Sequence, residues 1–157
     1  MPEEITQELP RWQKFNIPVV YIAGLLLAAT AAHLAWGGWP TARSVWAGML
    51  LLGVGLGMNL LCVRMMKRHQ TAILPRGAPS TLLRSGPFRY FRNPIYQGML
   101  LAMGGVALAV GSLPFFLIIP VMWRVLRRRF VPMEEANLAR VFGEQYAAYC
   151  REVPRGI

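Results

Sequence analysis

The chain has 157 residues, of which 55% are hydrophobic, and a formal net charge of +10 at neutral pH. Its apolar residues form long blocks, which argues against a soluble protein, and the length leaves room for one domain. The basic residues flank these blocks, as in membrane proteins, so we expect no nucleic-acid partner, and two isolated cysteines give no metal-ligand spacing.

Residues 1–16 are expected to be a cytoplasmic N-terminus. Three glutamates and only two basic residues precede the first apolar block, which is the wrong charge balance for a secretory signal. Residues 17–63 are expected to hold the first two membrane spans, at 17–36 and 45–63. Gly53 and Gly57 in the second span have the small-x-x-x-small spacing of closely packed helices, which fits internal packing and a homo-oligomer equally well.

The stretch 64–94 is expected to be a cytoplasmic loop, because it combines seven basic residues with several prolines and glycines. The connection between the first two spans carries only Arg43. The positive-inside rule therefore places both chain termini and the long loop on the cytoplasmic side.

Residues 95–130 are expected to form a helical hairpin. The segment 95–123 is apolar for 29 residues, too long for one upright span and too short for two complete ones. Gly111 and Pro114 in its middle indicate a turn. The alternative is one tilted helix kinked at Pro114, which would place the basic residues 124–129 outside, against the positive-inside rule.

Residues 131–157 are expected to form an amphipathic helix and tail, lying on the lipid surface or capping the bundle. Two glutamates occupy its first turn, where the helix dipole favours acids. Its apolar stripe consists of Leu138, Val141, Phe142, Gln145, Tyr146 and Tyr149. The predicted fold class is thus all-α and integral to the membrane, with about four transmembrane helices and this C-terminal helix.

A hairpin would bring residues 85–96 beside residues 124–135, so that aromatic rings, arginines and two carboxylates share one pocket. Aromatic faces attract an onium centre, arginine pairs with a carboxylate, and glutamate accepts hydrogen bonds from an amine or a ribose. S-adenosylmethionine carries all of these groups. The alternative is that these residues only anchor helix ends at the membrane interface.

Two sequence blocks resemble the isoprenylcysteine carboxyl methyltransferase and phospholipid methyltransferase group of membrane enzymes. The first is GPFRYFRNPIYQG at 86–98; the second is EEANL at 134–138, followed by FGEQY at 142–146, Tyr149 and VPR at 153–155. The two blocks extend from about Ser80 to the C-terminus. The resemblance implies methyl transfer from S-adenosylmethionine to a lipid-like substrate that enters from the bilayer.

The resemblance also implies the site residues. The implied cofactor contacts are Thr81, Leu82, Leu83, Phe88, Asn93, Pro94, Ile95, Tyr96 and Glu134. An arginine before the glutamates contacts the substrate, and Arg129 fits best, with Arg128 possible because this chain carries one extra residue there. Eukaryotic prenylcysteine enzymes have histidine where this chain has Asn93, and bacterial relatives often have asparagine there. The resemblance therefore implies a methyltransferase without implying the prenylcysteine substrate, and the expected location is the bacterial inner membrane.

Methyl transfer from a sulfonium is an in-line displacement, so the protein mainly aligns the reactants and excludes water. An amine acceptor also needs a base, and Glu134 or Glu135 is the nearest; the catalytic candidates are therefore Arg129 and Glu135. Acceptors left open are a phospholipid amine, a prenylated or fatty carboxylate, a quinone-like lipid and a thiol. The rival functions are an NADPH-dependent lipid reductase and a non-enzymatic protein that binds anionic membrane lipids.

Overall fold

The computed structural model describes residues 18–36, 40–71 and 79–157. The predicted N-terminal segment 1–16 and the middle of the predicted loop therefore lie outside the described residues. The elements are α2 (Pro18–Trp36), α3 (Val45–Arg68), the 3₁₀ turn η1 (Gly86–Arg89), α4 (Pro94–Val110), α5 (Leu113–Val125), the π-helical turn η2 (Leu126–Phe130) and α6 (Val131–Glu152). The all-α fold class is confirmed.

Two helices, α2 and α3, are long and apolar enough to cross a membrane, with 19 and 24 residues. The apolar α4 has 17 residues and α5 has 13, so both are shorter than a usual span. Helix α3 continues to Arg68, five residues beyond the predicted end of the second span. Arginine, lysine and methionine are good helix formers, so the helix need not stop where the hydrophobic block does.

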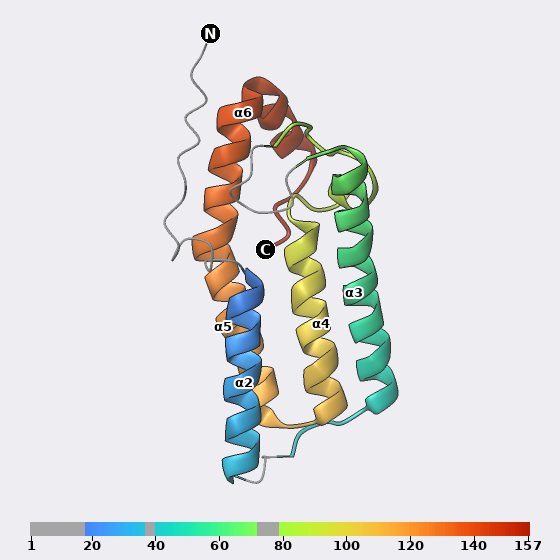
Figure 1. Cartoon of the computed structure of the whole chain (residues 1–157), viewed down its shortest axis with the longest axis vertical. Coiled ribbons are helices and arrows are strands. Elements are labelled where there is room, and N and C mark those ends of the chain that lie inside the picture. Colours follow the sequence, from blue (N-terminus) through green and yellow to red (C-terminus); the bar gives the residue numbers. More distant parts are fainter. Residues whose placement is uncertain (1–17, 37–39, 72–78) are drawn as a thin grey trace.

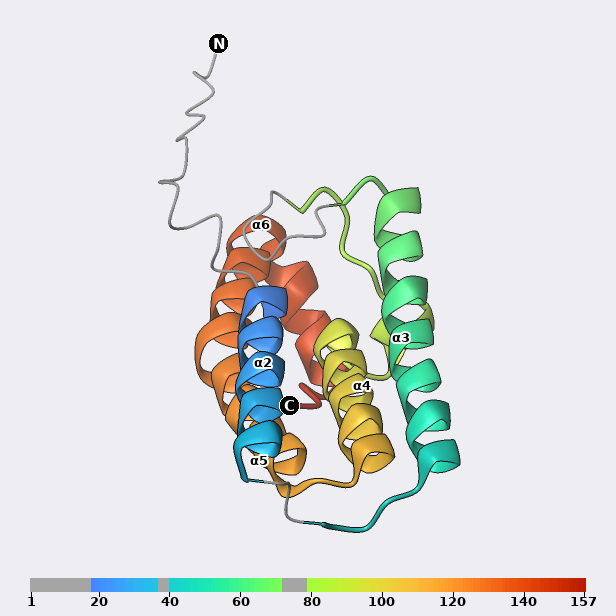
Figure 2. The ribbon, with the colours of Figure 1, turned by 60° about the horizontal axis from the view of Figure 1, so that its bottom comes forward.

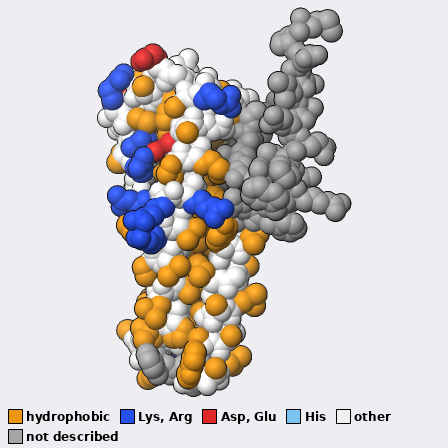
Figure 3. Space-filling model, turned by 90° about the vertical axis from the view of Figure 1, so that its left-hand side faces the viewer, with side chains coloured by type: hydrophobic (Ala, Val, Ile, Leu, Met, Phe, Trp, Pro, Cys, Tyr) orange, Lys and Arg blue, Asp and Glu red, His pale blue; other side chains and the backbone are white. Residues whose placement is uncertain are grey.

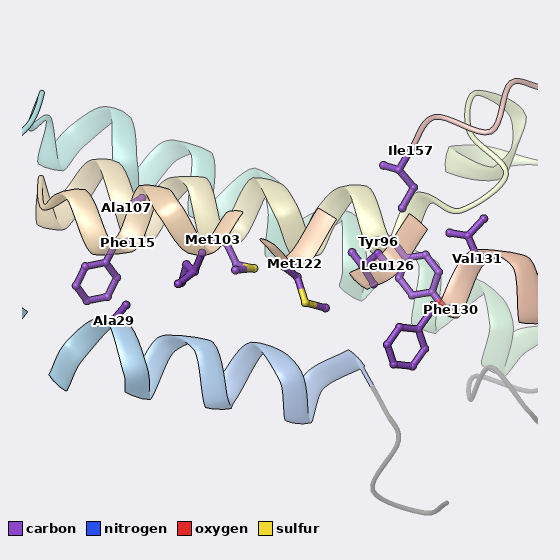
Figure 4. Packing of buried hydrophobic residues seen from close by; sticks show 11 residues of the cluster. Ala29, Tyr96, Met103, Ala107, Phe115, Met122, Leu126, Phe130, Val131 and Ile157 are labelled. Atoms are coloured by element: carbon purple, nitrogen blue, oxygen red, sulfur yellow. The ribbon is translucent and has the colours of Figure 1, made fainter. Parts of the chain in front are cut away.

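Helix α4 lies between α2 and α3, and α5 packs against both α2 and α4 (Figures 1 and 2). The interior between α2, α4 and α5 is filled by apolar side chains from Ala29 and Phe115 at one end to Tyr96 and Phe130 at the other (Figure 4). The turn between α4 and α5 falls within the predicted four residues: Gly111 is left-handed with φ 69°, and Ser112 precedes α5.

Helices α3 and α4 are in backbone contact along their length, and glycines allow it. A Cβ atom on Gly55 would lie 2.6 Å from the nitrogen of Ala102, and one on Gly105 would lie 2.5 Å from that of Leu52. Gly53 and Gly57 have nothing within 4 Å of such an atom. The prediction that these two glycines serve internal helix packing is therefore wrong. Their role in a homo-oligomer stays a prediction.

Helices α5 and α6 form one continuous rod through η2, which then bends near the far end of α6 (Figure 1). The bend is at Gly143, with φ 47° and ψ −122°. It breaks the single stripe predicted for this helix: Tyr146 and Tyr149 are buried, whereas Val141 is 42% exposed. The part beyond the bend folds back over the start of α4, and Tyr146, Tyr149 and Val153 form a second small core.

Candidate functional site

The approach to α4 is held by a hydrogen bond from the last helix. The Tyr149 hydroxyl donates to the carbonyl oxygen of Phe88 at 2.6 Å. Gly86 opens η1 with φ 58°, and a side chain there would collide with the sulfur of Met65. The position of Phe88 is thus fixed by both α3 and α6.

Asn93 and Pro94 begin α4. Pro94 stands in the first turn, where its missing N–H costs no hydrogen bond. Asn93 is the N-cap but makes no side-chain capping bond, although it is only 4% exposed. Its amide nitrogen is buried without a partner among the described residues. An unpaired buried donor costs about 1 to 3 kcal/mol, so this amide is available to a ligand.

Glu134 in the first turn of α6 meets Tyr96 in the first turn of α4. The Tyr96 hydroxyl donates a hydrogen bond to the Glu134 carboxylate. The pKa of Glu134 is raised from 4.5 to about 7, mainly because burial disfavours the charged form; the bond from Tyr96 lowers the pKa, and the charge of Glu135 raises it. Near neutral pH this carboxyl can therefore hold or release a proton.

Glu135 forms ion pairs with two arginines. Its Oε1 lies 3.2 Å from Nη1 of Arg92 and 3.0 Å from Nε of Arg155, and its side chain is 12% exposed. The backbone N–H of Arg92 also donates to the carbonyl oxygen of Pro154 at 3.1 Å. These bonds attach the C-terminal tail to both α6 and the start of α4.

Replacing Arg92 with alanine is expected to lower the free energy of unfolding by about 2 kcal/mol, because Glu135 is largely buried and would keep only Arg155. The matched control is Arg84→Ala, whose partner Glu152 is 68% exposed and lies 3.5 Å away. That change should cost about 1 kcal/mol or less. Thermal unfolding in detergent measures both, and equal losses would contradict this ranking.

One cavity of about 310 Å³ collects most of the predicted site residues. Of those residues its walls contain Phe88, Asn93, Pro94, Ile95, Tyr96 and Glu134. Pro18, Val19, Asn59, Val63, Met66, Arg92 and Met99 complete the lining. Asn59 was not predicted; its signal is an uncharged polar side chain inside an apolar span. Arg92 belongs to the stretch 85–96 that was predicted to share a pocket, although it was assigned no role.

Three polar atoms on this cavity's residues are buried and have no hydrogen-bond partner among the described residues. They are Oδ1 of Asn59, Nε of Arg92 and Nδ2 of Asn93. Buried polar groups in proteins are nearly always paired, so three around one cavity mark a place for ordered water or a polar ligand. The volume lies at the lower end of the range for small-molecule sites.

Sequence comparison places this site in a known family. A model of the family "Phospholipid methyltransferase" matches residues 43–145, which include α3, α4, α5 and the two glutamates of α6. The chain belongs to the phospholipid methyltransferase family. Its members are membrane enzymes that use S-adenosylmethionine as methyl donor, so the predicted resemblance is confirmed.

Curated relatives of this methyltransferase family agree. The chain is 28% identical over 111 residues to "Protein-S-isoprenylcysteine O-methyltransferase" of Schizosaccharomyces pombe, covering 70% of this chain and 47% of the relative. It is 31% identical over 77 residues to "Protein-S-isoprenylcysteine O-methyltransferase B" of Arabidopsis thaliana, covering 48% and 39%.

A bacterial relative matches over a longer stretch. "Cobalt-zinc-cadmium resistance protein CzcN" of Cupriavidus metallidurans is 28% identical over 137 residues, covering 86% of this chain and 59% of the relative. The chain thus spans from 39% to 59% of the length of these three relatives. No solved structure matches.

Four residues predicted from the family pattern do not line this cavity. Thr81 and Leu82 line a separate, open hollow beside Phe142 and Arg151, and Leu83 is buried near them. The guanidinium of Arg129 lies 5.7 Å from the ring centre of Tyr21 on α2, at the surface of η2. Arg128 is also exposed. The cofactor role of the first three and the substrate role of Arg129 stay predictions.

The raised pKa of Glu134 gives a pH dependence. In the folded protein the Glu134 carboxyl keeps its proton up to a pH of about 7, whereas in the unfolded chain it releases the proton near pH 4.5. The unfolding free energy should therefore fall by about 3 kcal/mol as the pH rises through this window, and level off above it. Glu134→Gln should remove the fall. Parallel stability curves for the two proteins, from about pH 5 to pH 8, would contradict this assignment.

Proposed function

We propose that this protein is an S-adenosylmethionine-dependent methyltransferase of a lipid-like acceptor, and that the cavity between α2, α3, α4 and α6 is its active site. The observation that carries the proposal is the meeting of Phe88, Asn93, Tyr96 and Glu134 around one cavity with unpaired polar atoms. These residues come from segments up to 46 positions apart. If each segment only anchored a helix end at the membrane interface, these side chains would have no reason to line the same cavity.

The chemistry of the lining suits the cofactor. The rings of Phe88 and Tyr96 offer faces for a positively charged sulfur. The unpaired Nε of Arg92 and Nδ2 of Asn93 are donors that fit a carboxylate or ribose oxygens. Glu134 is an acceptor for an ammonium group or hydroxyls. The sulfonium, carboxylate, ammonium and hydroxyl groups of the cofactor thus each have a complementary residue in the lining of this cavity.

Bound S-adenosylmethionine supplies an electrophilic methyl group on a sulfonium centre. The protein's part is to align the acceptor with that methyl group and to exclude water. The apolar walls formed by Val63, Met66 and Met99 serve the second task. For an amine acceptor, Glu134 is placed to remove the proton, because its pKa of about 7 lets it accept one near neutral pH. Arg129 and Glu135 are the further catalytic candidates from the sequence.

We further propose that α2, α3, α4 and α5 all span the membrane, with the short α4 and α5 as the two arms of a hairpin. The basic side chains support this placement, because on the face seen in Figure 3 they lie over the half of the molecule near α6 while the other half is mostly hydrophobic. By the positive-inside rule, the half with α6 and the site is cytoplasmic. Both termini are then cytoplasmic, in the inner membrane of a bacterium.

Binding of S-adenosylmethionine and of NADPH to the detergent-purified protein, measured by calorimetry, tests the proposal. Saturable binding of the sulfonium compound alone is the expected result. Binding of NADPH alone would contradict the methyltransferase and favour a lipid reductase. Binding of neither would favour a non-enzymatic protein that holds anionic lipid.

A further inference from the structure

Asn59 lies in the middle of an apolar helix, and its side-chain oxygen has no hydrogen-bond partner among the described residues. An asparagine in a membrane-spanning helix usually forms a hydrogen bond to a neighbouring helix. Here its Oδ1 is buried and accepts no hydrogen bond from the described residues. That oxygen packs against Gly98 on α4, where a Cβ atom would collide with it. The amide is thus held against α4 without being used by the fold.

The depth of Asn59 separates it from the polar end of the cavity. It stands nine residues before Arg68 at the end of α3, about 14 Å along the helix axis. The apolar cavity walls nearest to it along α3 and α4 are Val63, one turn away, and Met99, which follows Gly98. Asn93 and Glu134, by contrast, lie at the ends of α4 and α6 that face one another. Asn59 is therefore the polar group of the apolar half of the cavity.

The charges around the cavity restrict what Asn59 can hold. The charged side chains in the cavity's described lining are Arg92 and Glu134, and the proposed function assigns the unpaired Nε of Arg92 to the cofactor. With Arg92 engaged by the cofactor, a phosphate or carboxylate next to Asn59 would have no cation among the described lining residues, and a buried unpaired charge is strongly disfavoured. A neutral amide, ester or hydroxyl would instead satisfy the carboxamide of Asn59.

We infer that the apolar half of the cavity is the acceptor subsite, and that Asn59 orients the acceptor through a hydrogen bond to a neutral polar group close to the methylated atom. The acceptor class is a lipid whose hydrocarbon part contacts Val63 and Met99. This inference rests on the proposed function, and it makes Asn59 a specificity-determining residue on α3, outside the two sequence blocks of the resemblance.

The test compares Asn59→Leu and Asn59→Ala with the wild-type protein and with Leu60→Ala, whose parent side chain is 51% exposed on the outer face of α3. Two quantities are measured: the Kd for S-adenosylmethionine by calorimetry, and the transfer of its labelled methyl group to vesicles made from the total lipid of the expression host. Both Asn59 variants should keep the Kd within about twofold and lower kcat/KM for lipid by about 10- to 100-fold. Leu60→Ala should change neither quantity.

Each other result overturns the inference in a distinguishable way. An equal loss of cofactor affinity in both variants would make Asn59 a cofactor residue. Unchanged lipid methylation in a variant that melts at the wild-type temperature would make it a packing residue. If the wild-type protein binds S-adenosylmethionine but labels no lipid, only the inference about the acceptor subsite is contradicted. If it does not bind S-adenosylmethionine, the proposed function itself is contradicted. A labelled product with a phosphate or carboxylate beside the methylated atom would contradict the neutral class.

Discussion

Replacing Glu134 with alanine is expected to weaken binding of S-adenosylmethionine by about 100-fold, which corresponds to the loss of one or two hydrogen bonds to a charged group. Glu134 is the acidic residue in the described lining of the cavity, and Tyr96 fixes its orientation. The alanine variant should stay folded. Burial raises the pKa of the wild-type Glu134 to about 7, which means that the charged carboxylate is unfavourable in the folded state and its removal should not unfold the protein. Calorimetry and thermal unfolding measure the two effects.

The matched control for this experiment is Glu144→Ala. Glu144 lies on the same helix, beyond the bend at Gly143, and lines the separate hollow next to Thr81 and Leu82. It should leave cofactor affinity unchanged if the cavity around Glu134 is the binding site. Loss of affinity in Glu144→Ala with none in Glu134→Ala would move the site to that hollow, where the sequence also predicted cofactor contacts.

Replacing Gly55 with leucine is expected to destabilise the protein by about 3 kcal/mol or more, so that little folded protein is recovered. A Cβ atom at this position would lie 2.6 Å from the backbone nitrogen of Ala102 and 2.6 Å from the carbonyl oxygen of Gly98. Backbone atoms cannot move aside as a flexible side chain can, so α3 and α4 would have to separate. Because Asn59 and Asn93 lie on these two helices, the cavity would open as well.

Gly57→Leu on the same helix provides the control, since nothing lies within 4 Å of a Cβ atom there. It should be neutral, or stabilising by up to about 1 kcal/mol, because glycine is a poor helix former. Thermal unfolding and the yield of monodisperse protein in detergent distinguish the two variants. Equal behaviour of both would mean that α3 and α4 are not in backbone contact. A loss confined to Gly57→Leu would instead indicate a contact with a second copy.

Several features could be predicted from the sequence because they depend on local composition. The helix-forming blocks follow from runs of apolar residues, and the turn between α4 and α5 follows from a left-handed Gly111 next to a proline-containing helix start. The family followed from two blocks that carry chemistry at fixed spacing. Six of the nine predicted cofactor residues line one cavity, because they stand at helix starts whose positions the motifs themselves determine.

The contacts between helices depend on which helix faces meet. The alternating glycines of α3 do not reveal this in the sequence. Gly53, Gly55 and Gly57 have similar neighbours in sequence, yet only Gly55 of these three faces α4, because successive residues point about 100° apart around a helix. The same rotation turns Asn59 toward the cavity. The bend at Gly143 arises from a conformation that glycine permits and does not require.

The positions of Thr81 and Arg129 likewise depended on tertiary structure. Thr81 lies on a loop whose path is set by the packing of Leu82 against Tyr149 and its neighbours, and the sequence contains no local signal for that path. The direction of Arg129 is set by the wide π-helical turn between α5 and α6. Sequence by itself determined the helices, the basic residues that flank the apolar blocks and the chemistry at the helix starts. Only the packing of one helix on another decided which side chains share a cavity, because that depends on rotation and approach distance between segments far apart in the chain.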